Sequence, residues 1–200
     1  MTQPGFEWND IYSGDASDYV APPPLVLDAV ASLAPGDVLD VGCGAGGLLA
    51  TLAERGWTPH GIDIAPRAIE AARAVFGRCG LDATLRVADA ASWRPSRTYD
   101  LVTCCFAAPN TRADQQRAYA AMRRAVAPGG TVVVLDFDPQ MHRLPPFRGF
   151  DMVAVADLLE AFDGFEITRA EVVEVPAHDH GQGDDGTGPW TASLLVARRR

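Results

Sequence analysis

Short apolar runs rich in β-branched residues alternate along the chain with longer stretches of helix-forming residues. Several of the apolar runs are hydrophobic on both faces, as the strands of a buried parallel sheet are. Strands are predicted at Asp37–Val41, His60–Ile64, Ala83–Val87, Tyr99–Cys104 and Gly130–Leu135. Helices rich in Ala, Arg, Leu and Glu are predicted over residues 46–55, 66–78, 112–126 and 151–162. This alternation predicts a right-handed, doubly wound α/β sheet.

The pattern differs at the two ends of the chain. Phe165–Val175 and Trp190–Arg198 have strand character with only a loop between them, which predicts an antiparallel hairpin appended to the parallel sheet. Residues 1–34 precede the first strand and are expected to form two short helices, the second introduced by Pro22-Pro23-Pro24. Residues 1–200 therefore form one domain in this interpretation, with residues 1–34 as a helical lid and residues 35–200 as the α/β core.

Composition and charge exclude several classes of function. All 17 basic residues are arginine, so the chain has neither a Schiff-base lysine nor a P-loop lysine. The 26 acidic residues give a net charge of −9, which disfavours a nucleic-acid partner. No apolar run has the length of a membrane span, and no signal peptide is recognised at the start. The cysteines form no CxxC pair, which favours reduced thiols and a cytoplasmic location.

A glycine-rich turn links the first predicted strand to the helix that follows it. Gly42, Gly44 and Gly47 satisfy the GxGxxG pattern, in which glycines let backbone N–H groups approach a ligand closely. Asp63 lies at the end of the second strand, where a carboxylate can accept hydrogen bonds from ribose hydroxyls. Asp40 lies beside the glycine turn, where it would repel a pyrophosphate but attract a ligand with a positive amino group.

Five segments in order, VLDVGCGAG, GIDIA, RVADAASW, TYDLVTCCF and APGGTVVV, resemble those of the class I S-adenosylmethionine (SAM)-dependent methyltransferases. The resemblance covers residues 35–198. It implies a Rossmann-like, seven-stranded sheet in the order 3-2-1-4-5-7-6 with strand 7 antiparallel. It also implies SAM as the methyl donor, S-adenosylhomocysteine (SAH) as the product, and a small-molecule acceptor. The short chain and the Trp-x-x-x-Tyr pattern at Trp8 and Tyr12 resemble the branch that includes tellurite-resistance and thiopurine methyltransferase-like proteins.

The resemblance assigns roles to residues at three strand ends. It implies that Asp40 holds the amino group of SAM and that Asp63 binds the ribose. Ile64 is then expected to pack on the adenine. Asp89 is expected to accept a hydrogen bond from the adenine amino group, with the backbone N–H of Ala90 beside it.

Other residues are expected around the methionine part of SAM. Gly42 and Gly44 are expected to pass close to it, and the carbonyl groups near Cys105 and Phe106 to flank it. Tyr12 is expected to close over the cofactor, although packing of a short amphipathic helix would also account for an aromatic residue there.

No catalytic residue is identified from the pattern alone. His142, His178 and His180 are candidate general bases. Residues 137–150 could form either a substrate wall or an irregular connection. The two histidines of the Gly-rich loop 176–189 could also bind a metal, but a solvated loop is favoured, and no metal is predicted.

Two other functions fit parts of the pattern. A non-catalytic SAM-binding regulator would keep the same acidic positions, and an NAD(P)-dependent oxidoreductase would use the same glycine turn. The expected partner is a small molecule, without a nucleic acid or membrane partner, and the expected state is a monomer or homodimer.

Overall fold

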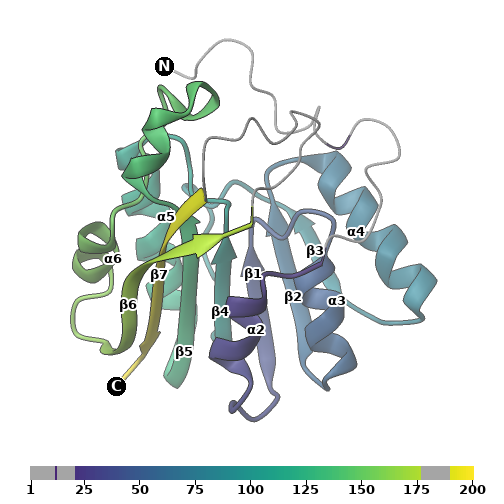
Figure 1. The fold of residues 1–200 in the computed structure, drawn as a ribbon. Coiled ribbons are helices and arrows are strands. Elements are labelled where there is room, and N and C mark those ends of the chain that lie inside the picture. Colours follow the sequence, from purple (N-terminus) through teal and green to yellow (C-terminus); the bar gives the residue numbers. More distant parts are fainter. Residues whose placement is uncertain (1–11, 13–20, 177–189) are drawn as a thin grey trace.

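One mixed sheet organises the molecule (Figure 1). The computed structural model describes Tyr12, residues 21–176 and residues 190–200. Its strands are β1 (Asp37–Val41), β2 (Thr58–Asp63), β3 (Thr84–Val87), β4 (Tyr99–Cys105), β5 (Val126–Phe137), β6 (Glu166–Val175) and β7 (Trp190–Arg198). The strand order is β3-β2-β1-β4-β5-β7-β6, which confirms the predicted order.

Helices cover both faces of the sheet (Figure 1). They are α2 (Pro24–Val30), α3 (Gly47–Glu54), α4 (Pro66–Cys79), α5 (Arg112–Ala125) and α6 (Val155–Ala161). Helices α2, α3 and α4 share one core with the sheet, through residues such as Val26, Leu49 and Ile69. Helices α5 and α6 pack on the opposite face through residues such as Tyr119 and Leu158. The helix faces that carry these apolar residues are thus buried against the strands.

The order of the parallel strands reverses between β1 and β4. β1 pairs in parallel with both β2 and β4, so that Asp40 stands beside Gly61 on one side and Thr103 on the other. In such sheets, the connections leave the two central strands in opposite directions, and a crevice opens at their carboxyl ends. The topology therefore places the glycine turn after β1 at the position where doubly wound proteins bind ligands.

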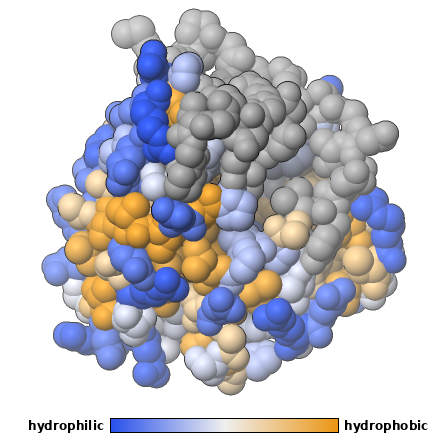
Figure 2. Space-filling model, in the orientation of Figure 1, coloured by the Kyte–Doolittle hydropathy of each residue, from blue (hydrophilic) through white to orange (hydrophobic). Residues whose placement is uncertain are grey.

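The final hairpin confirms the predicted reversal of the last strand. β7 runs antiparallel to both β5 and β6, with Phe137 of β5 beside Ala192 of β7. β6 is an edge strand, and its Ile167 and Val172 are exposed. Figure 2 shows the apolar surface that gathers over this side of the molecule.

Several boundaries differ from the predicted ones. β5 is longer than expected and contains the turn at Pro128–Gly130, because its pairing with β4 shifts register between Tyr99 and Leu101. α6 begins only at Val155, because the Asp157 side chain accepts a hydrogen bond from the backbone N–H of Ala154 at 2.9 Å.

Short helices lie in the connection after β5 and in the segment before β1. Residues 137–150 contain two short 3₁₀ helices, η1 (Pro139–Arg143) and η2 (Pro145–Phe147). Of the two expected N-terminal helices, α2 is present, and the other falls outside the described residues. Among the helices that the structure describes, none combines the length and apolar character needed to cross a membrane.

Candidate functional site

The turn after β1 has a backbone that only glycine adopts readily. Gly42 and Gly44 have φ values of +74° and +51°. A Cβ atom on Gly42 would lie 2.1 Å from the Cβ atom of Ala107, in the connection that follows β4. The N–H groups of Gly42 and Cys43 both donate to the carbonyl of Ile62, at 2.8 and 3.0 Å. The turn is therefore held against the end of β2 and packs closely on the connection after β4.

Asp63 joins this turn to the start of α4. One carboxylate oxygen accepts a hydrogen bond from the N–H of Gly44 at 2.9 Å, and the other accepts from Ala65 at 2.8 Å. Only 8% of the residue is exposed, and burial raises the pKa of its carboxyl group. A carboxylate has about four acceptor sites, so each oxygen can still accept from a ligand.

Asp40 is a second buried carboxyl group at the same edge. It is 4% exposed and accepts a hydrogen bond from the Thr103 hydroxyl, with Oγ1 and Oδ1 separated by 2.6 Å. Burial raises the pKa of Asp40 to about 7, with a further contribution from Asp63, while the Thr103 bond opposes the rise. Within the described ranges, neither Asp40 nor Asp63 has an ion-pair partner. The two carboxyl groups thus form an acidic site suited to a cationic ligand.

Thr103 was not identified from the sequence. It is the one polar side chain among the buried residues at the centre of β4, and its side chain is completely buried. No local sequence pattern pointed to this residue, because its hydroxyl has a role only once the parallel pairing of β1 and β4 places it beside Asp40.

Tyr12 lies next to the glycine turn. Its hydroxyl oxygen is 2.8 Å from the position that a Cβ atom of Gly44 would occupy. Burial raises the pKa of Tyr12, and the charges of Asp63, Cys43 and Asp40 add to this effect. The phenol therefore belongs to the same cluster as the two acidic residues.

Apolar side chains are exposed next to this cluster at the ends of β2 and β3. Ile64 is 53% exposed and Val87 is 51% exposed. Asp89 follows Val87, is exposed, and accepts a hydrogen bond from the N–H of Ala91 at 2.9 Å. Ala90 is half-buried. The exposed apolar residue Val87 was not predicted.

The opposite side of the glycine turn is bordered by the end of β4. Cys105 is half-buried, and Phe106 has a φ of +53°, which is unusual for a residue with a side chain. Asp136 of β5 supports this connection by accepting hydrogen bonds from the N–H groups of Ala108 and Phe137, at 2.7 and 2.8 Å. Burial raises the pKa of Asp136 to about 6.

Of the three candidate bases, the structure describes His142. His142 lies exposed in η1. Its Nε2 is 2.8 Å from the carbonyl oxygen of Phe150, and because a carbonyl oxygen only accepts, this nitrogen carries the hydrogen and is the donor. His178 and His180 lie outside the described residues. In the part of the chain that the structure describes, no three His, Cys, Asp or Glu side chains could share a metal ion.

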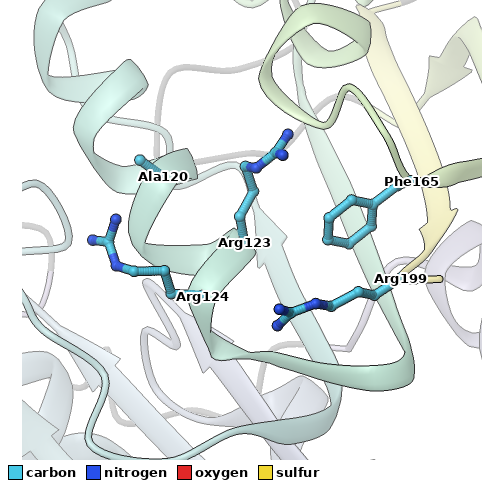
Figure 3. Close-up of a pocket in the computed structure, with 5 residues that line it drawn as sticks. All are labelled: Ala120, Arg123, Arg124, Phe165 and Arg199. Carbon is cyan, nitrogen blue, oxygen red and sulfur yellow. The ribbon is translucent and has the colours of Figure 1, made fainter.

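A separate hollow of about 260 Å³ lies at the opposite edge of the sheet (Figure 3). Its lining residues are Ala120, Arg123, Arg124, Phe165 and Arg199. Arg123 donates to the carbonyl of Ala161 at 2.7 Å and lies 5.4 Å from the Phe165 ring centroid. Arg199 donates to the carbonyl of Val126 at 2.6 Å. These arginines therefore brace the ends of α5 and α6.

The fold and the acidic glycine turn define a class, the Rossmann-like α/β proteins that bind a nucleoside-containing cofactor at the reversal point of the sheet. Residues 38–130 match a family model described as a methyltransferase domain. The chain is 35% identical over 130 residues to the demethylmenaquinone methyltransferase of Thermus thermophilus, an alignment that covers 64% of this chain. The same alignment spans 56% of that relative, so the chain matches little more than half of its length.

Two solved structures have the same fold. A protein from work on the conversion of a disulfide bond into a thioacetal group during echinomycin biosynthesis is 26% identical, with a TM-score of 0.74. The match covers 96% of this chain and 91% of that one. The N-methyltransferase NodS from Bradyrhizobium japonicum, in complex with SAH, is 19% identical with a TM-score of 0.70, over 88% of this chain and 84% of that one. Residues 38–130 are thus similar in sequence to methyltransferase domains, and the chain has the Rossmann-like fold of SAM-dependent methyltransferases.

Proposed function

We propose that this protein transfers the methyl group of SAM to a small-molecule acceptor. The observation that carries the proposal is the pair of buried carboxyl groups, Asp40 and Asp63, at the glycine turn that follows β1. SAM carries a positive amino group and a positive sulfonium, and both are favoured next to desolvated carboxylates. When bound, SAM supplies an electrophilic methyl group.

Asp40 and Asp63 have separate roles in this proposal. Asp40 holds the amino group of SAM, and Thr103 orients the carboxylate from the neighbouring strand through the 2.6 Å hydrogen bond. Asp63 accepts hydrogen bonds from the ribose hydroxyls while it continues to hold Gly44 and Ala65. The ribose site and the glycine turn are therefore one unit, because the same carboxylate organises both.

Ile64 suits the adenine ring, because it presents exposed apolar surface that a planar base would bury. Asp89 lies two residues after Val87, beyond the end of the neighbouring strand β3, where it can accept from the adenine amino group, and the backbone N–H of Ala90 adjoins it. Exposure of two large apolar residues at one edge is a feature that ligand binding would remove.

The methionine part of SAM would lie between the glycine turn and the end of β4. The carbonyl groups near Cys105 and Phe106 flank this space in the proposal, and Tyr12 covers it from above Gly44. Of the predicted lid formed by residues 1–34, we therefore propose a covering role for the part around Tyr12, whereas α2 packs with the core of residues 35–200. A cytoplasmic location and a monomeric or homodimeric state remain predictions.

A dinucleotide fits the same turn poorly. Its pyrophosphate would approach Gly42 and Gly44, next to the carboxyl groups of Asp40 and Asp63. Like charges in a buried setting repel strongly, so an NAD(P) cofactor is disfavoured.

The experiment is a calorimetric titration of the purified chain with SAH. Asp63→Ala is expected to weaken binding by about 1–3 kcal/mol, roughly 5- to 150-fold, because polar partners are left unpaired. Asp100→Ala is the matched control, since Asp100 also accepts a backbone hydrogen bond, from Asp37, but at the opposite end of the strands. Absence of SAH binding by the natural chain would contradict the proposal, as would an unchanged dissociation constant for Asp63→Ala. A chain that binds SAM but forms no SAH with any acceptor would be a SAM-binding regulator.

A further inference from the structure

Four aromatic rings form a cluster around Phe137 at the carboxyl edge of the sheet. Phe106 follows β4, Phe137 ends β5, Phe147 lies in η2 and Trp190 begins β7. The ring centroids of Phe137 lie 4.7 Å from Phe106, 4.7 Å from Phe147 and 5.6 Å from Trp190, and those of Phe147 and Trp190 are 5.2 Å apart. Each of the four residues is half-buried. We call these four residues the aromatic wall.

The aromatic wall continues directly from the proposed SAM site. The Cβ position of Gly42 is in contact with Ala107, which follows Phe106 in the chain. Asp136 then accepts hydrogen bonds from Ala108 and from Phe137, so one carboxylate holds both the connection after β4 and the central ring of the wall. An acceptor on this wall would therefore lie beside the methyl donor.

The first ring of the wall is held by an unusual backbone. Phe106 has a φ of +53°, a conformation that residues with a side chain rarely adopt. Its N–H donates to the carbonyl of Leu135 at 2.7 Å, which ties the strained residue to β5. The Phe106 ring packs against Phe137 in this conformation. Strain of this kind is retained where the surrounding structure enforces it, and it concentrates at functional sites.

The surroundings of the wall are apolar. Met141, Leu144 and Met152 form a buried cluster behind it. Asp136 and Asp138 are buried beside it, and both oxygens of each accept hydrogen bonds from protein groups.

The exposed ionisable groups of the η1–η2 segment include His142, Arg143 and Arg148, all of them basic types. Because Phe147 of the wall lies in this segment, positive groups of the segment favour the anionic form of a ligand bound beside it. A hydroxyl that loses its proton more readily than an alcohol would therefore be favoured here.

We infer that the aromatic wall is the acceptor site, and that the acceptor is a planar aromatic ring bearing an acidic hydroxyl group. The inference rests on the proposed function, because the ring is placed beside a SAM-bound site. Aromatic rings pack against such a wall in offset or edge-to-face arrangements, which a saturated ring cannot reproduce. In the transfer, the oxygen–carbon bond forms as the carbon–sulfur bond breaks. The electron pair remains on sulfur, and the hydroxyl proton leaves to water.

The test compares two diols with the same carbon skeleton. 1,4-Dihydroxynaphthalene, kept reduced under argon, is aromatic, whereas decahydronaphthalene-1,4-diol is saturated. Calorimetric titration of the SAH-loaded protein is expected to show about tenfold tighter binding of the aromatic diol. Formation of SAH from SAM is then measured with both diols.

Variants of the wall link this preference to the proposed residues. Phe147→Leu and Trp190→Leu are each expected to weaken binding of the aromatic diol about tenfold and to leave SAH binding unchanged. Phe147→Tyr keeps the ring and is expected to retain affinity. Phe165→Leu is the matched control, because Phe165 is also half-buried but lies beside the distant hollow of Figure 3. Circular dichroism establishes that each variant is folded.

The outcomes separate the two proposals. Equal binding of the two diols would overturn the aromatic assignment, as would an unchanged affinity in both Phe147→Leu and Trp190→Leu. Binding of SAH without any binding of the aromatic diol would overturn it as well. Absence of SAH binding by the natural chain would contradict the proposed function instead. Aromatic binding without SAH formation supports the wall as a ligand site and contradicts methyl transfer to this class of acceptor.

Discussion

At the scale of single residues, the chemistry of the site is concentrated in carboxyl groups whose environment differs from that of their sequence neighbours. Asp37 and Asp40 both belong to β1, but only Asp40 is fully enclosed. Its burial beside Asp63 raises its pKa to about 7. The unpaired carboxyl group is costly for the protein alone and is stabilised by a cationic ligand.

The first prediction concerns the pH dependence of stability. The folded chain keeps a proton on Asp40 up to about pH 7, whereas the unfolded chain loses it near the ordinary carboxyl pKa. The stabilising contribution is therefore complete below the ordinary pKa and is lost as the pH rises through about 7. Asp40→Asn is expected to remove this part of the decline and to raise the melting temperature at pH 8. The melting temperatures of the natural chain and of the variant are measured by thermal denaturation from acid to alkaline pH.

The same variant is expected to weaken SAH binding, because Asn cannot carry the negative charge that the amino group of the ligand favours. Asp136→Asn is the comparison, since the pKa of Asp136 is raised to about 6 but its oxygens hold the connection after β4. An Asp40→Asn variant with the natural pH profile would show that Asp40 does not titrate as proposed.

At the scale of elements, the glycine turn that follows β1 contacts the carboxyl end of β2 and the connection after β4. Gly42 packs against the connection after β4, its N–H donates to the carbonyl of Ile62 in β2, and the N–H of Gly44 donates to Asp63. Most of these contacts cross the sheet between segments far apart in the chain. The turn therefore fixes the relative position of the strand ends that form the site.

The second prediction compares two glycines with similar backbone conformations. Gly42→Ala is expected to lower SAH affinity by at least roughly tenfold and to destabilise the fold, since its Cβ atom would lie 2.1 Å from that of Ala107. Gly80→Ala is the control, because Gly80 has a φ of +65° but nothing within 4 Å of its added Cβ atom. The control is expected to cost only about 1 kcal/mol of backbone strain. Calorimetry and thermal denaturation measure both variants, and equal losses would contradict the close packing of Gly42.

The boundaries of a helix or strand could be predicted from the sequence where nearby residues set them. The limits of α4 and α5 followed from their composition and from Pro66 at the helix start, and the structure differs from them by one residue. The extent of β5 and the late start of α6 did not, because they depend on pairing with β4 and on a cap from Asp157. The 3₁₀ turns of η1 and η2 gave no periodic signal.

At the scale of the whole molecule, ligand binding is coupled to stability because the site joins β1, β2, β3 and β4. A ligand that binds only the folded state stabilises it by mass action. The third prediction is that SAH at about 100 times its dissociation constant stabilises the chain by about 2.7 kcal/mol, which corresponds to a rise in melting temperature of roughly 5–10 °C.

NADH at the same concentration is expected to leave the melting temperature unchanged, because its pyrophosphate would meet the two buried carboxyl groups. Asp63→Ala is expected to reduce the SAH-induced shift. A larger shift with NADH than with SAH would favour the oxidoreductase alternative over methyl transfer.

The sequence by itself determined the fold class, the strand order through its family resemblance, and the acidic residues at the strand ends. These features are local, since alternating apolar runs, glycines and strand-end carboxylates are visible within a few residues of one another. Only the tertiary structure decided that Thr103 faces Asp40, that Asp63 holds Gly44, and that Phe106, Phe137, Phe147 and Trp190 form one aromatic wall. Each of these contacts joins separate segments, and their meeting depends on strand register and on the reversal of β7.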